Sequence, residues 1–374
     1  MVIAEHGCWS LLKGGIVANF STAVEILFES KNTKVEIWVD NVSLQPFTKK
    51  QWKAHQDISI DKVRKSEVRF QVTQANKTAM QGAIVSIKQF KSEFPFGCGM
   101  NHIILKSTDY QNWFASRFKF TTFTNEMKWY STEKKQGQEN YTVPDAMVKF
   151  AKQNGISIRE FYSTAYQLDP NAIMFMNEYN TIEYSEDQTV SAANYKKKLE
   201  EILQYPGNDR ILAGIGLQGR FGSGQPNLAY MRSSLDILGA TGVPIWLTEV
   251  NVDKDPDQAQ YLEEILREGY SHPAVQGIVM FAGPEIAGFK VMPLADTNFQ
   301  STPAGDVVDM LLGEWKCSET LEFTADDKGF VDVLLFHGDY NVTVQHTEAN
   351  SSTTLGLRVT KDIPQATIDV QIHT

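Results

Sequence analysis

The chain has little of what marks disulfide-rich, membrane-spanning or nucleic-acid-binding proteins. Its 374 residues include three cysteines, Cys8, Cys98 and Cys317, which are too few and too scattered for a disulfide framework or a zinc site. No apolar run approaches the roughly 20 residues of a membrane-spanning helix. The formal net charge of −10 disfavours nucleic acid and anionic membranes as partners. We therefore expect free thiols, no metal, no cofactor, and neither a nucleic-acid nor a membrane partner.

The first residues, MVIAEHG, also lack the basic region and apolar core of a signal peptide. The location of this chain as it stands is therefore left open. Acceptor patterns for N-glycosylation are present and favour a secretory parent protein. They begin at Asn19, Asn41, Asn76, Asn140, Asn341 and Asn350.

From residue 94 onward, short apolar runs alternate with amphipathic segments. The strand candidates are residues 94–101, 118–126, 156–159, 172–179, 211–218, 244–250 and 277–281. This alternation predicts a parallel sheet, and its length predicts a barrel. Only seven strands are found where a closed barrel needs eight, and a single short helix fits between residues 159 and 172. The predicted fold class is α/β, a (β/α)₈ TIM barrel that is incomplete around strands three and four.

Small β appendages are predicted on both sides of this barrel. Residues 1–46 alternate in strand fashion, over 23–29 and 33–40, like the last strands of an antiparallel domain. Residues 47–93 are predicted to be a charged, helix-compatible linker followed by a small β segment. The barrel is assigned to residues 94–316, and residues 317–374 to a carboxyl-terminal β appendix without catalytic features.

Glu249 is the most informative residue, because it ends the otherwise apolar run VPIWLTEV. Buried strands rarely hold a carboxylate unless it is paired or used. At the carboxyl end of a barrel strand, a charged side chain points into the mouth, where chemistry takes place. The alternative is a solvated glutamate just past a strand end. Glu249 is accordingly the first candidate for a catalytic group.

Polar clusters follow other predicted strands and would meet Glu249 at the same rim. They contain Asn125, Glu126 and Lys128 after the second strand, Asn177 and Glu178 after the fourth, and Gln218 and Arg220 after the fifth. Each could instead be a helix cap or a turn. Together, amide, carboxylate and aromatic groups suit sugar hydroxyls and apolar sugar faces. Glycoside hydrolysis needs two carboxylates, and the residues themselves suggest Glu249 as nucleophile with Glu178 as its partner.

Four of these segments closely resemble the plant branch of the glycoside hydrolase family 10 endo-β-1,4-xylanases. They are FTNEMKWYSTE (123–133), FMNEYN (175–180), GIGLQ (214–218) and WLTEV (246–250). The resemblance covers roughly residues 55–316 and implies a (β/α)₈ barrel, a retaining mechanism and β-1,4-xylan or xylo-oligosaccharides as substrate. It implies an extracellular or cell-wall location for the parent family. Residues 1–46 resemble the end of the family-22-type xylan-binding β-sandwich that precedes this barrel, and we expect a monomer.

Carried over by position, the resemblance makes Glu249 the nucleophile. It places Asn125 and Lys128 against sugars on the non-reducing side, and makes Gln218 a support of the nucleophile. Asn177 joins the candidates for substrate binding. These roles are what the resemblance implies for each matching residue.

The departures from the family pattern concern the chemistry directly. The family's acid/base glutamate belongs to a stretch that would follow residue 159 and is absent, so Glu178 becomes a weak substitute, with Glu126 behind it. Thr124 stands where the family has a sugar-binding glutamate. Arg220 stands where the family has a histidine, and we expect it to form a salt bridge with Glu249.

Three interpretations follow from the sequence. The chain is an active xylanase with a recruited acid, a catalytically inactive xylan-binding remnant, or the product of an incomplete gene model or splice form. Because the acid/base segment is missing, we expect negligible cleavage of xylan, while sugar binding survives.

Overall fold

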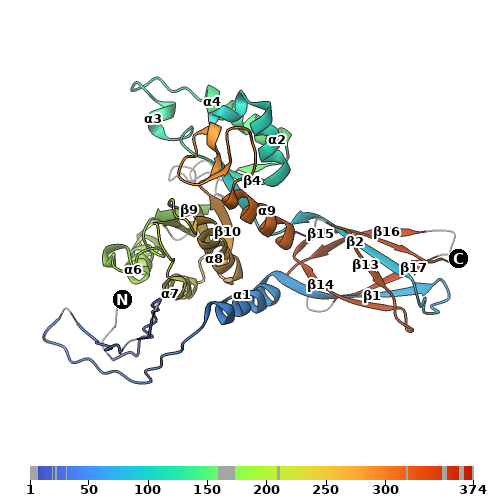
Figure 1. The fold of residues 1–374 in the computed structure, drawn as a ribbon, viewed down its shortest axis with the longest axis horizontal. Helices are drawn as coiled ribbons and strands as arrows, with labels where there is room; N and C mark the ends of the chain where they lie inside the picture. Colours follow the sequence, from blue (N-terminus) through green and yellow to red (C-terminus); the bar gives the residue numbers. More distant parts are fainter. Residues whose placement is uncertain are drawn as a thin grey trace.

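The computed structural model describes residues 7–158, 173–208, 211–316, 319–347, 352–361 and 366–372, except positions 19, 22 and 31. Figure 1 shows a β-sandwich on one side, an α/β body in the centre and an extended amino-terminal segment beneath that body. No helix in these described ranges is long and apolar enough to cross a bilayer.

The α/β body is built on a curled sheet with the strand order β5-β4-β3-β10-β9-β7-β6. Every neighbouring pair runs parallel. The strands are β3 (Phe96–Met100), β4 (Phe120–Phe123), β5 (Ser157–Ile158), β6 (Ile173–Glu178), β7 (Leu212–Leu217), β9 (Ile245–Val252) and β10 (Val275–Met280), with a short β8 (Arg220–Phe221) beside β9. All seven predicted strands are present. The fold is that of a TIM barrel, incomplete between β5 and β6 in the described part of the chain; residues 159–172, where the shortfall was predicted, lie outside it.

Helices alternate with these strands, as the amphipathic segments predict. They are α2 (Thr108–Arg117), α3 (Trp129–Thr132), α4 (Thr142–Gln153), α6 (Ala192–Leu203), α7 (Leu228–Gly239), α8 (Gln258–Ser271) and α9 (Pro303–Trp315). Short 3₁₀ turns are η1 (His102–Leu105), η2 (Gln188–Val190) and η3 (Glu285–Ala287), and β11 (Gly283–Pro284) pairs with β12 (Pro293–Ala295). The starts are encoded locally: Thr302 caps α9 ahead of Pro303, and Asn227 caps α7.

Aromatic side chains fill the interior of the curled sheet. Trp246 of β9 packs against Phe120 of β4, with ring centroids 5.2 Å apart, and against Phe175 of β6 at 6.4 Å. A Cβ atom at Gly277 would overlap the ring of Trp246, so β10 needs a glycine at that point. β9 is buried along almost its whole length, whereas every residue of β6 is only half-buried. β6 is therefore a margin of this core.

The sandwich combines two segments that the sequence analysis separated. Its strands are β1 (Lys65–Gln74), β2 (Ile84–Ser92), β13 (Leu321–Thr324), β14 (Phe330–Phe336), β15 (Gly338–Gln345), β16 (Thr353–Val359) and β17 (Ala366–Ile372). One sheet has the order β14-β1-β17 and the other β13-β2-β15-β16. Fully buried side chains such as Phe70, Ile87 and Tyr340 form its separate core. The segment after residue 64 and the carboxyl-terminal appendix are thus halves of one unit, because each supplies the strands that the other needs.

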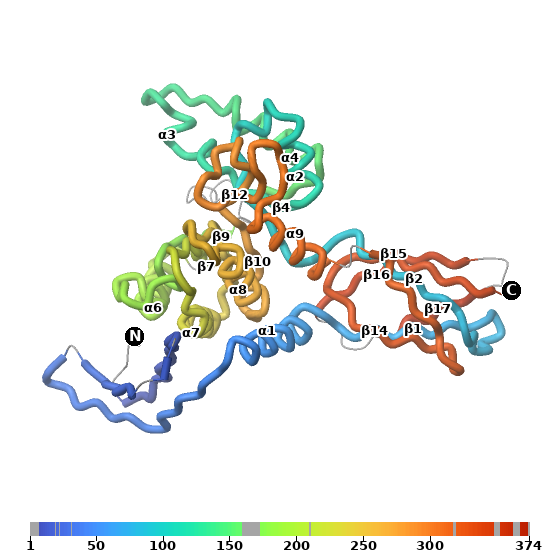
Figure 2. The backbone as a smooth tube through the Cα atoms, viewed as in Figure 1, coloured from blue at the N-terminus to red at the C-terminus, as the bar shows by residue number. Residues whose placement is uncertain are grey.

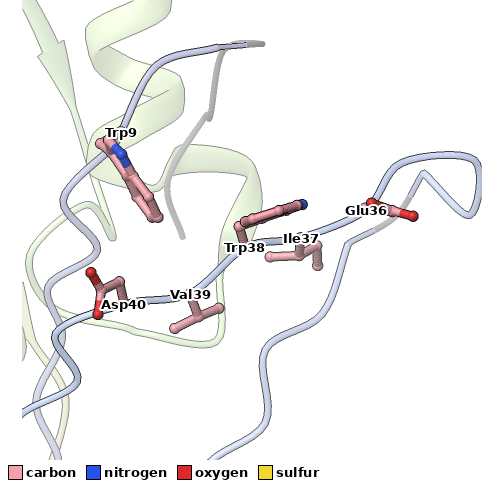
Figure 3. Close-up of a pocket in the computed structure, with 6 residues that line it drawn as sticks. All are labelled: Trp9, Glu36, Ile37, Trp38, Val39 and Asp40. Carbon is pink, nitrogen blue, oxygen red and sulfur yellow. The ribbon is translucent and has the colours of Figure 1, made fainter.

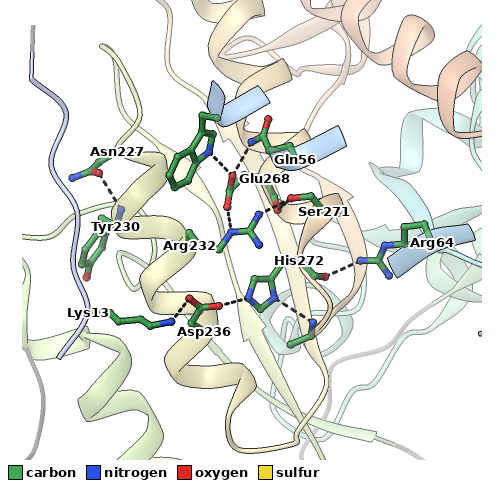
Figure 4. Close-up of polar contacts among 12 residues, drawn as sticks. Lys13, Gln56, Arg64, Asn227, Tyr230, Arg232, Asp236, Glu268, Ser271 and His272 are labelled. Atoms are coloured by element: carbon green, nitrogen blue, oxygen red, sulfur yellow. Dashed lines mark hydrogen bonds and ion pairs between the residues drawn. The ribbon is translucent and has the colours of Figure 1, made fainter. Parts of the chain in front are cut away.

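The predicted linker is helix α1 (Lys49–Arg64), which begins with a capping box between Thr48 and Gln51. It packs on α8 rather than hanging free. Trp52 Nε1 and Gln56 Nε2 donate to the buried carboxylate of Glu268, over 2.8 and 2.7 Å. Figure 4 shows that carboxylate also paired with Arg232 of α7. This network ties three helices together near the amino-terminal ends of the strands, since α8 runs towards the start of β10.

The amino-terminal segment differs from its predicted structure. In the described part of residues 7–48 no helix or strand forms, so the strands expected over 23–29 and 33–40 are absent there. Side chains such as Trp38, 78% exposed, face solvent because the described part of this segment forms no sheet that could pack them against a second layer. Figure 2 shows this segment running beside α7. There Lys13 pairs with Asp236 at 3.0 Å (Figure 4), and Asn227 donates to the carbonyl of Gly15.

Candidate functional site

Glu249 lies at the carboxyl-terminal edge of the parallel sheet, as predicted from its place in the apolar run. β7 ends at Leu217, which pairs with Leu247, so β9 extends beyond its neighbour at the position of Glu249. Between Leu247 and Val250, β9 has one residue more than the facing stretch of β10. Such a bulge changes the direction of the side chains that follow it. The bulge explains how the consecutive residues Thr248 and Glu249 of β9 can direct their side chains to the same side of the sheet.

The side chain of Asn177 on β6 contacts both of these residues, Thr248 and Glu249. Thr248 Oγ1 donates to Asn177 Oδ1 over 2.7 Å, and Asn177 Nδ2 lies 3.5 Å from Glu249 Oε1. The side chain of Asn177 crosses β7 at Gly216, where a Cβ atom would come within 2.7 Å of Asn177 Oδ1. The glycine in GIGLQ therefore makes room for this contact. Asn177 and Glu249, two of the predicted site residues, are brought together.

Arg220 forms the salt bridge with Glu249 that its position predicts. Its Nε lies 3.1 Å from Glu249 Oε2, and its Nη2 also contacts that oxygen. The guanidinium packs over the ring of Phe281, with Cζ 4.4 Å from the ring centroid. Among the described residues, the side-chain partners of the Glu249 carboxylate are Arg220 and Asn177. The candidate nucleophile is therefore held by one cation and one amide.

Gln218 connects neighbouring strand ends through its backbone. Its N–H donates to the carbonyl of Glu178, and its carbonyl accepts from the N–H of Glu249, both over 2.8 Å. Gly219 follows with φ +74°, in the left-handed region that favours glycine. These contacts fix the backbone of the turn beside Glu249. Because any residue at position 218 could make them, the predicted supporting role of the Gln218 side chain stays a prediction.

Glu183 belongs to this site and was missed by the sequence analysis. It is buried, and it accepts from the N–H groups of Gly219 and Arg220 over 2.8 and 2.9 Å. Burial raises the pKa of Glu183, and the backbone amides that donate to it limit the rise. Its only sequence signal is a glutamate shortly after FMNEYN, which is also what a solvated loop would contain.

Glu178, the weak substitute for the acid, faces away from Glu249. Side chains alternate along a strand, and Asn177 contacts Thr248 on the inner face of the sheet. Glu178 consequently points to the outer side, where it raises the pKa of Tyr195 on helix α6, after the larger effect of that tyrosine's burial. β7 also lies between β6 and β9. Glu178 is thus on the wrong face to protonate a bond cleaved at Glu249.

Glu126, the second substitute, is fully engaged as an acceptor within its own loop. It is buried and accepts from the backbone N–H of His102 over 2.8 Å and from that of Asn125 over 3.1 Å. His102 Nδ1 lies 3.0 Å from the same carboxylate, and the buried hydroxyl of Thr124 is 3.4 Å from it. These contacts give Glu126 a structural role in shaping the loops after β3 and β4.

Asn125 and Lys128 form a second polar group at the same edge of the sheet. Lys128 Nζ and the hydroxyl of Tyr130 donate to Asn125 Oδ1 over 3.0 and 2.7 Å. The ring of Trp129 beside them is exposed. Among described residues, no hydrogen bond or ion pair joins this group to Asn177 or Glu249. The predicted site residues therefore occupy one rim in two groups.

Neither of the best-formed surface hollows includes this rim. One is shallow, lies in the amino-terminal segment and is lined by Trp9 and residues 36–40 (Figure 3). The other lies beside α2, around Asn112 and Asn298. Over the described ranges, no cluster of three or more histidine, cysteine, aspartate or glutamate side chains is placed to hold a metal ion.

Comparison with known proteins identifies the family. The profile described as Glycosyl hydrolase family 10 matches residues 86–161 and 157–283, two blocks that meet where the strand shortfall was predicted. An Arabidopsis thaliana protein named Endo-1,4-beta-xylanase 5-like is 48% identical over 438 aligned residues, covering 97% of this chain and 77% of that protein. Endo-1,4-beta-xylanase 5 of the same plant is 46% identical with the same coverage.

Solved structures are also similar to the chain. Native xylanase 10B from Thermotoga maritima is 17% identical, with a TM-score of 0.49, over 59% of this chain and 95% of that one. On the profile match and the Arabidopsis relatives, the chain belongs to glycosyl hydrolase family 10.

Proposed function

We propose that this chain binds β-1,4-xylan or xylo-oligosaccharides at the rim that carries Glu249 and cleaves them poorly or not at all. One observation carries the proposal. Glu249 occupies the nucleophile position, but its side-chain partners are Arg220 and Asn177. The two substitutes for the acid are engaged elsewhere, Glu178 beside Tyr195 and Glu126 with the N–H groups of His102 and Asn125. Retaining glycosidases hold their two carboxyl groups about 5–5.5 Å apart.

The missing group is a general acid. Without protonation, the oxygen of a sugar leaving group departs as a high-energy alkoxide, and the rate loss is on the order of 10²–10⁴-fold or more. The comparisons support a deleted segment, because the alignment with the first Arabidopsis relative spans 438 residues and therefore exceeds the 374 of this chain. The family profile matches in two blocks that overlap at residues 157–161, next to the point where the acid/base segment would be expected.

Arg220 weakens the nucleophile further. Glu249 Oε2 accepts two guanidinium N–H bonds, and this charge-assisted pairing stabilises the carboxylate relative to the ester it would form with the anomeric carbon. A histidine at position 220 would donate a single N–H. We therefore assign Arg220 an inhibitory effect on the covalent step.

Sugar binding needs neither an acid nor a free nucleophile. The group of Asn125, Lys128 and Tyr130 offers hydrogen-bond donors and acceptors, and the exposed ring of Trp129 offers an apolar face for a pyranose. The similarity to proteins named as xylanases supports xylan as the sugar polymer. The proposal includes a monomer that acts outside the cell or in the cell wall. It treats residues 1–46 as the remnant of a carbohydrate-binding sandwich, although no strand forms in the described part of that segment.

The test separates binding, nucleophilic attack and full turnover. Hydrolysis of soluble xylan and binding of xylohexaose are measured for the wild type and for Glu249→Gln. Dinitrophenyl β-xylobioside is then added, because dinitrophenolate leaves without protonation. In that step the anomeric carbon–oxygen bond breaks, dinitrophenolate carries away the electron pair, and an ester bond forms between the anomeric carbon and Glu249.

We expect xylohexaose binding, negligible xylan turnover, and slow release of about one dinitrophenolate per chain with a xylobiosyl mass added at Glu249. Glu249→Gln abolishes the labelling, and Arg220→His accelerates it. Robust turnover of xylan that Glu249→Gln abolishes would show a working acid and support the active-enzyme interpretation. A chain that neither binds xylohexaose nor becomes labelled would refute the proposal.

A further inference from the structure

We propose that Glu183 is a positioning residue, which holds Arg220 in contact with Glu249 through the backbone of the turn between β7 and β8. Among the described residues, no hydrogen bond or ion pair joins Glu183 to Glu249, so Glu183 acts on the ion pair through the turn. The inference rests on the proposed function in one respect, because Arg220 and Glu249 lie in the proposed sugar site.

The contacts of Glu183 are concentrated on one turn. Its Oε1 accepts from the N–H groups of both Gly219 and Arg220, while its Oε2 accepts from the N–H of Ile182 over 2.9 Å. The side chain is only 9% exposed. A buried carboxylate is costly unless its oxygens are satisfied, so the segment after β6 and the turn after β7 are bound to each other.

β9 holds the same turn from its other side. The N–H of Asn251 donates to the carbonyl of Gly219 over 3.1 Å, and β8 pairs Arg220 with Asn251. Position 219 also has little room for a side chain, because a Cβ there would lie 3.0 Å from Val250 Cγ2. Both peptides that flank Gly219 are therefore held in the same way, with the N–H bound to Glu183 and the carbonyl bound to an N–H of β9.

These contacts fix the backbone of Arg220 and therefore the direction in which its side chain leaves the turn. Arg220 is partly exposed, and an exposed arginine ordinarily samples many rotamers. With its N–H fixed by Glu183 and its Cζ over Phe281, the guanidinium is held towards Glu249. Removal of Glu183 frees the turn on one side, and the ion pair loses its preorganisation.

The experiment observes the Arg220 Nε–H directly, by NMR of the full chain with labelled arginine. In the wild type we expect a slowly exchanging signal, assigned by its loss in Arg220→Lys and its shift in Glu249→Gln. Glu183→Ala should make this proton exchange about tenfold faster, as expected when one or two net hydrogen bonds are lost. Glu183→Gln should restore slow exchange, because its remaining carbonyl oxygen can accept from both amides.

Two further variants keep the test decisive. Glu183→Asp retains the charge but withdraws the carboxylate from the turn, so it replaces Glu183→Ala if that variant does not fold, and we expect the same faster exchange. Glu126→Gln is the matched control, a buried rim carboxylate of similar exposure that contacts another loop, and it should leave the Arg220 signal unchanged. A folded Glu183→Ala or Glu183→Asp with an unaltered signal would overturn the inference.

Binding connects this result to the sugar site. Glu183→Asp and Arg220→Ala should change the affinity for xylohexaose by the same factor, and the double variant should show no additional change. Additive effects would show that Glu183 acts by another route. A wild type that does not bind xylohexaose would refute the proposed function, while the NMR result would still decide the role of Glu183.

Discussion

Carboxylates have opposite surroundings at the amino-terminal and carboxyl-terminal ends of the parallel strands. Towards the amino-terminal ends of the strands, Glu268 is completely buried and surrounded by the donors of Trp52, Gln56 and Arg232. At the carboxyl-terminal edge, Glu249 is about one-quarter exposed and has one guanidinium and a long amide contact. The first carboxylate is enclosed by helices, and the second is presented to solvent.

Because the two carboxylates differ in burial, disrupting their ion pairs should have different costs in the free energy of unfolding. A buried ion pair contributes little net stability when intact, but its disruption leaves an uncompensated buried charge. A half-exposed pair contributes only about 0–1 kcal/mol, because water screens it. Substitutions at the amino-terminal ends of the strands should therefore change mainly the free energy of unfolding. Substitutions at the rim should change mainly the binding and cleavage of ligand.

The largest effect is expected at Arg232. Arg232→Ala should lower the free energy of unfolding by about 3–5 kcal/mol, because the Glu268 carboxylate loses its cation inside the protein. Urea denaturation measures this. The matched control is the double variant Arg232→Met/Glu268→Gln. It removes both charges, keeps an amide oxygen that accepts from Trp52 and Gln56, and should cost much less. A single-variant loss under about 1 kcal/mol would contradict the distinction between the two ends of the strands.

Glu126 is the exception at the rim, and it sharpens the comparison. Glu126→Ala should lower the free energy of unfolding by about 2–3 kcal/mol, since the N–H groups of His102 and Asn125 lose their buried acceptor. Urea denaturation beside Glu249→Ala provides the test, with the smaller change expected for Glu249. Equal losses in the two variants would show that position on the rim matters more than burial.

A smaller, pH-dependent effect is expected where the amino-terminal segment contacts α7. Lys13 Nζ and His272 Nε2 lie 3.0 and 3.2 Å from the carboxylate of Asp236. His272 Nδ1 accepts from the N–H of Ala274, so Nε2 carries the ring proton. Burial alone would raise the pKa of Asp236, but the hydrogen bonds from His272 and Lys13 outweigh it and lower the pKa from 3.8 to about 2.

Because this folded-state pKa lies below the unfolded value, its contribution to the free energy of unfolding is complete above about pH 4 and is lost as the pH falls towards 2. Asp236 is 35% exposed, so screening reduces that contribution to ~1 kcal/mol. Urea denaturation at pH 5 and pH 2.5 should show the difference between the wild type and Asp236→Asn shrinking by about that amount. A difference that stays constant over this range would be inconsistent with the assignment.

The smallest change in stability is expected for Glu249→Gln. The amide oxygen still accepts from Arg220 at a partly exposed position, so the free energy of unfolding should change by no more than about 0.5 kcal/mol. The same variant should lose all covalent labelling by the activated xylobioside. A destabilisation above about 2 kcal/mol would place Glu249 with the structural carboxylates instead.

The parallel strands were predictable because burial on both faces leaves a continuous apolar run, as in residues 244–248. The sandwich was not, because alternation shows that one face of a strand is buried without showing which strand lies beside it. β1 pairs with β14 and β17, far along the chain. The same limitation explains residues 33–40, which alternate but pair with nothing in the described chain.

At the site, the apolar run predicted the place of Glu249, and the resemblance, with Arg220 at the position of a family histidine, predicted their ion pair. The sequence did not predict the roles of Glu183 and Glu126, which depend on backbone N–H groups that only the folded loops bring together. The sequence also did not predict the bulge in β9, because a one-residue shift in register does not alter the composition of the strand.

The sandwich also determines when this protein can finish folding. β2 ends at Ser92, but its partner β13 begins only at Leu321, after the whole α/β body has been translated. At ribosomal rates of about 5–20 residues per second, β1 and β2 wait on the order of ten seconds or more with unpaired edges. During that interval they are open to aggregation and to chaperones, and their late closure fastens the two ends of the barrel region together.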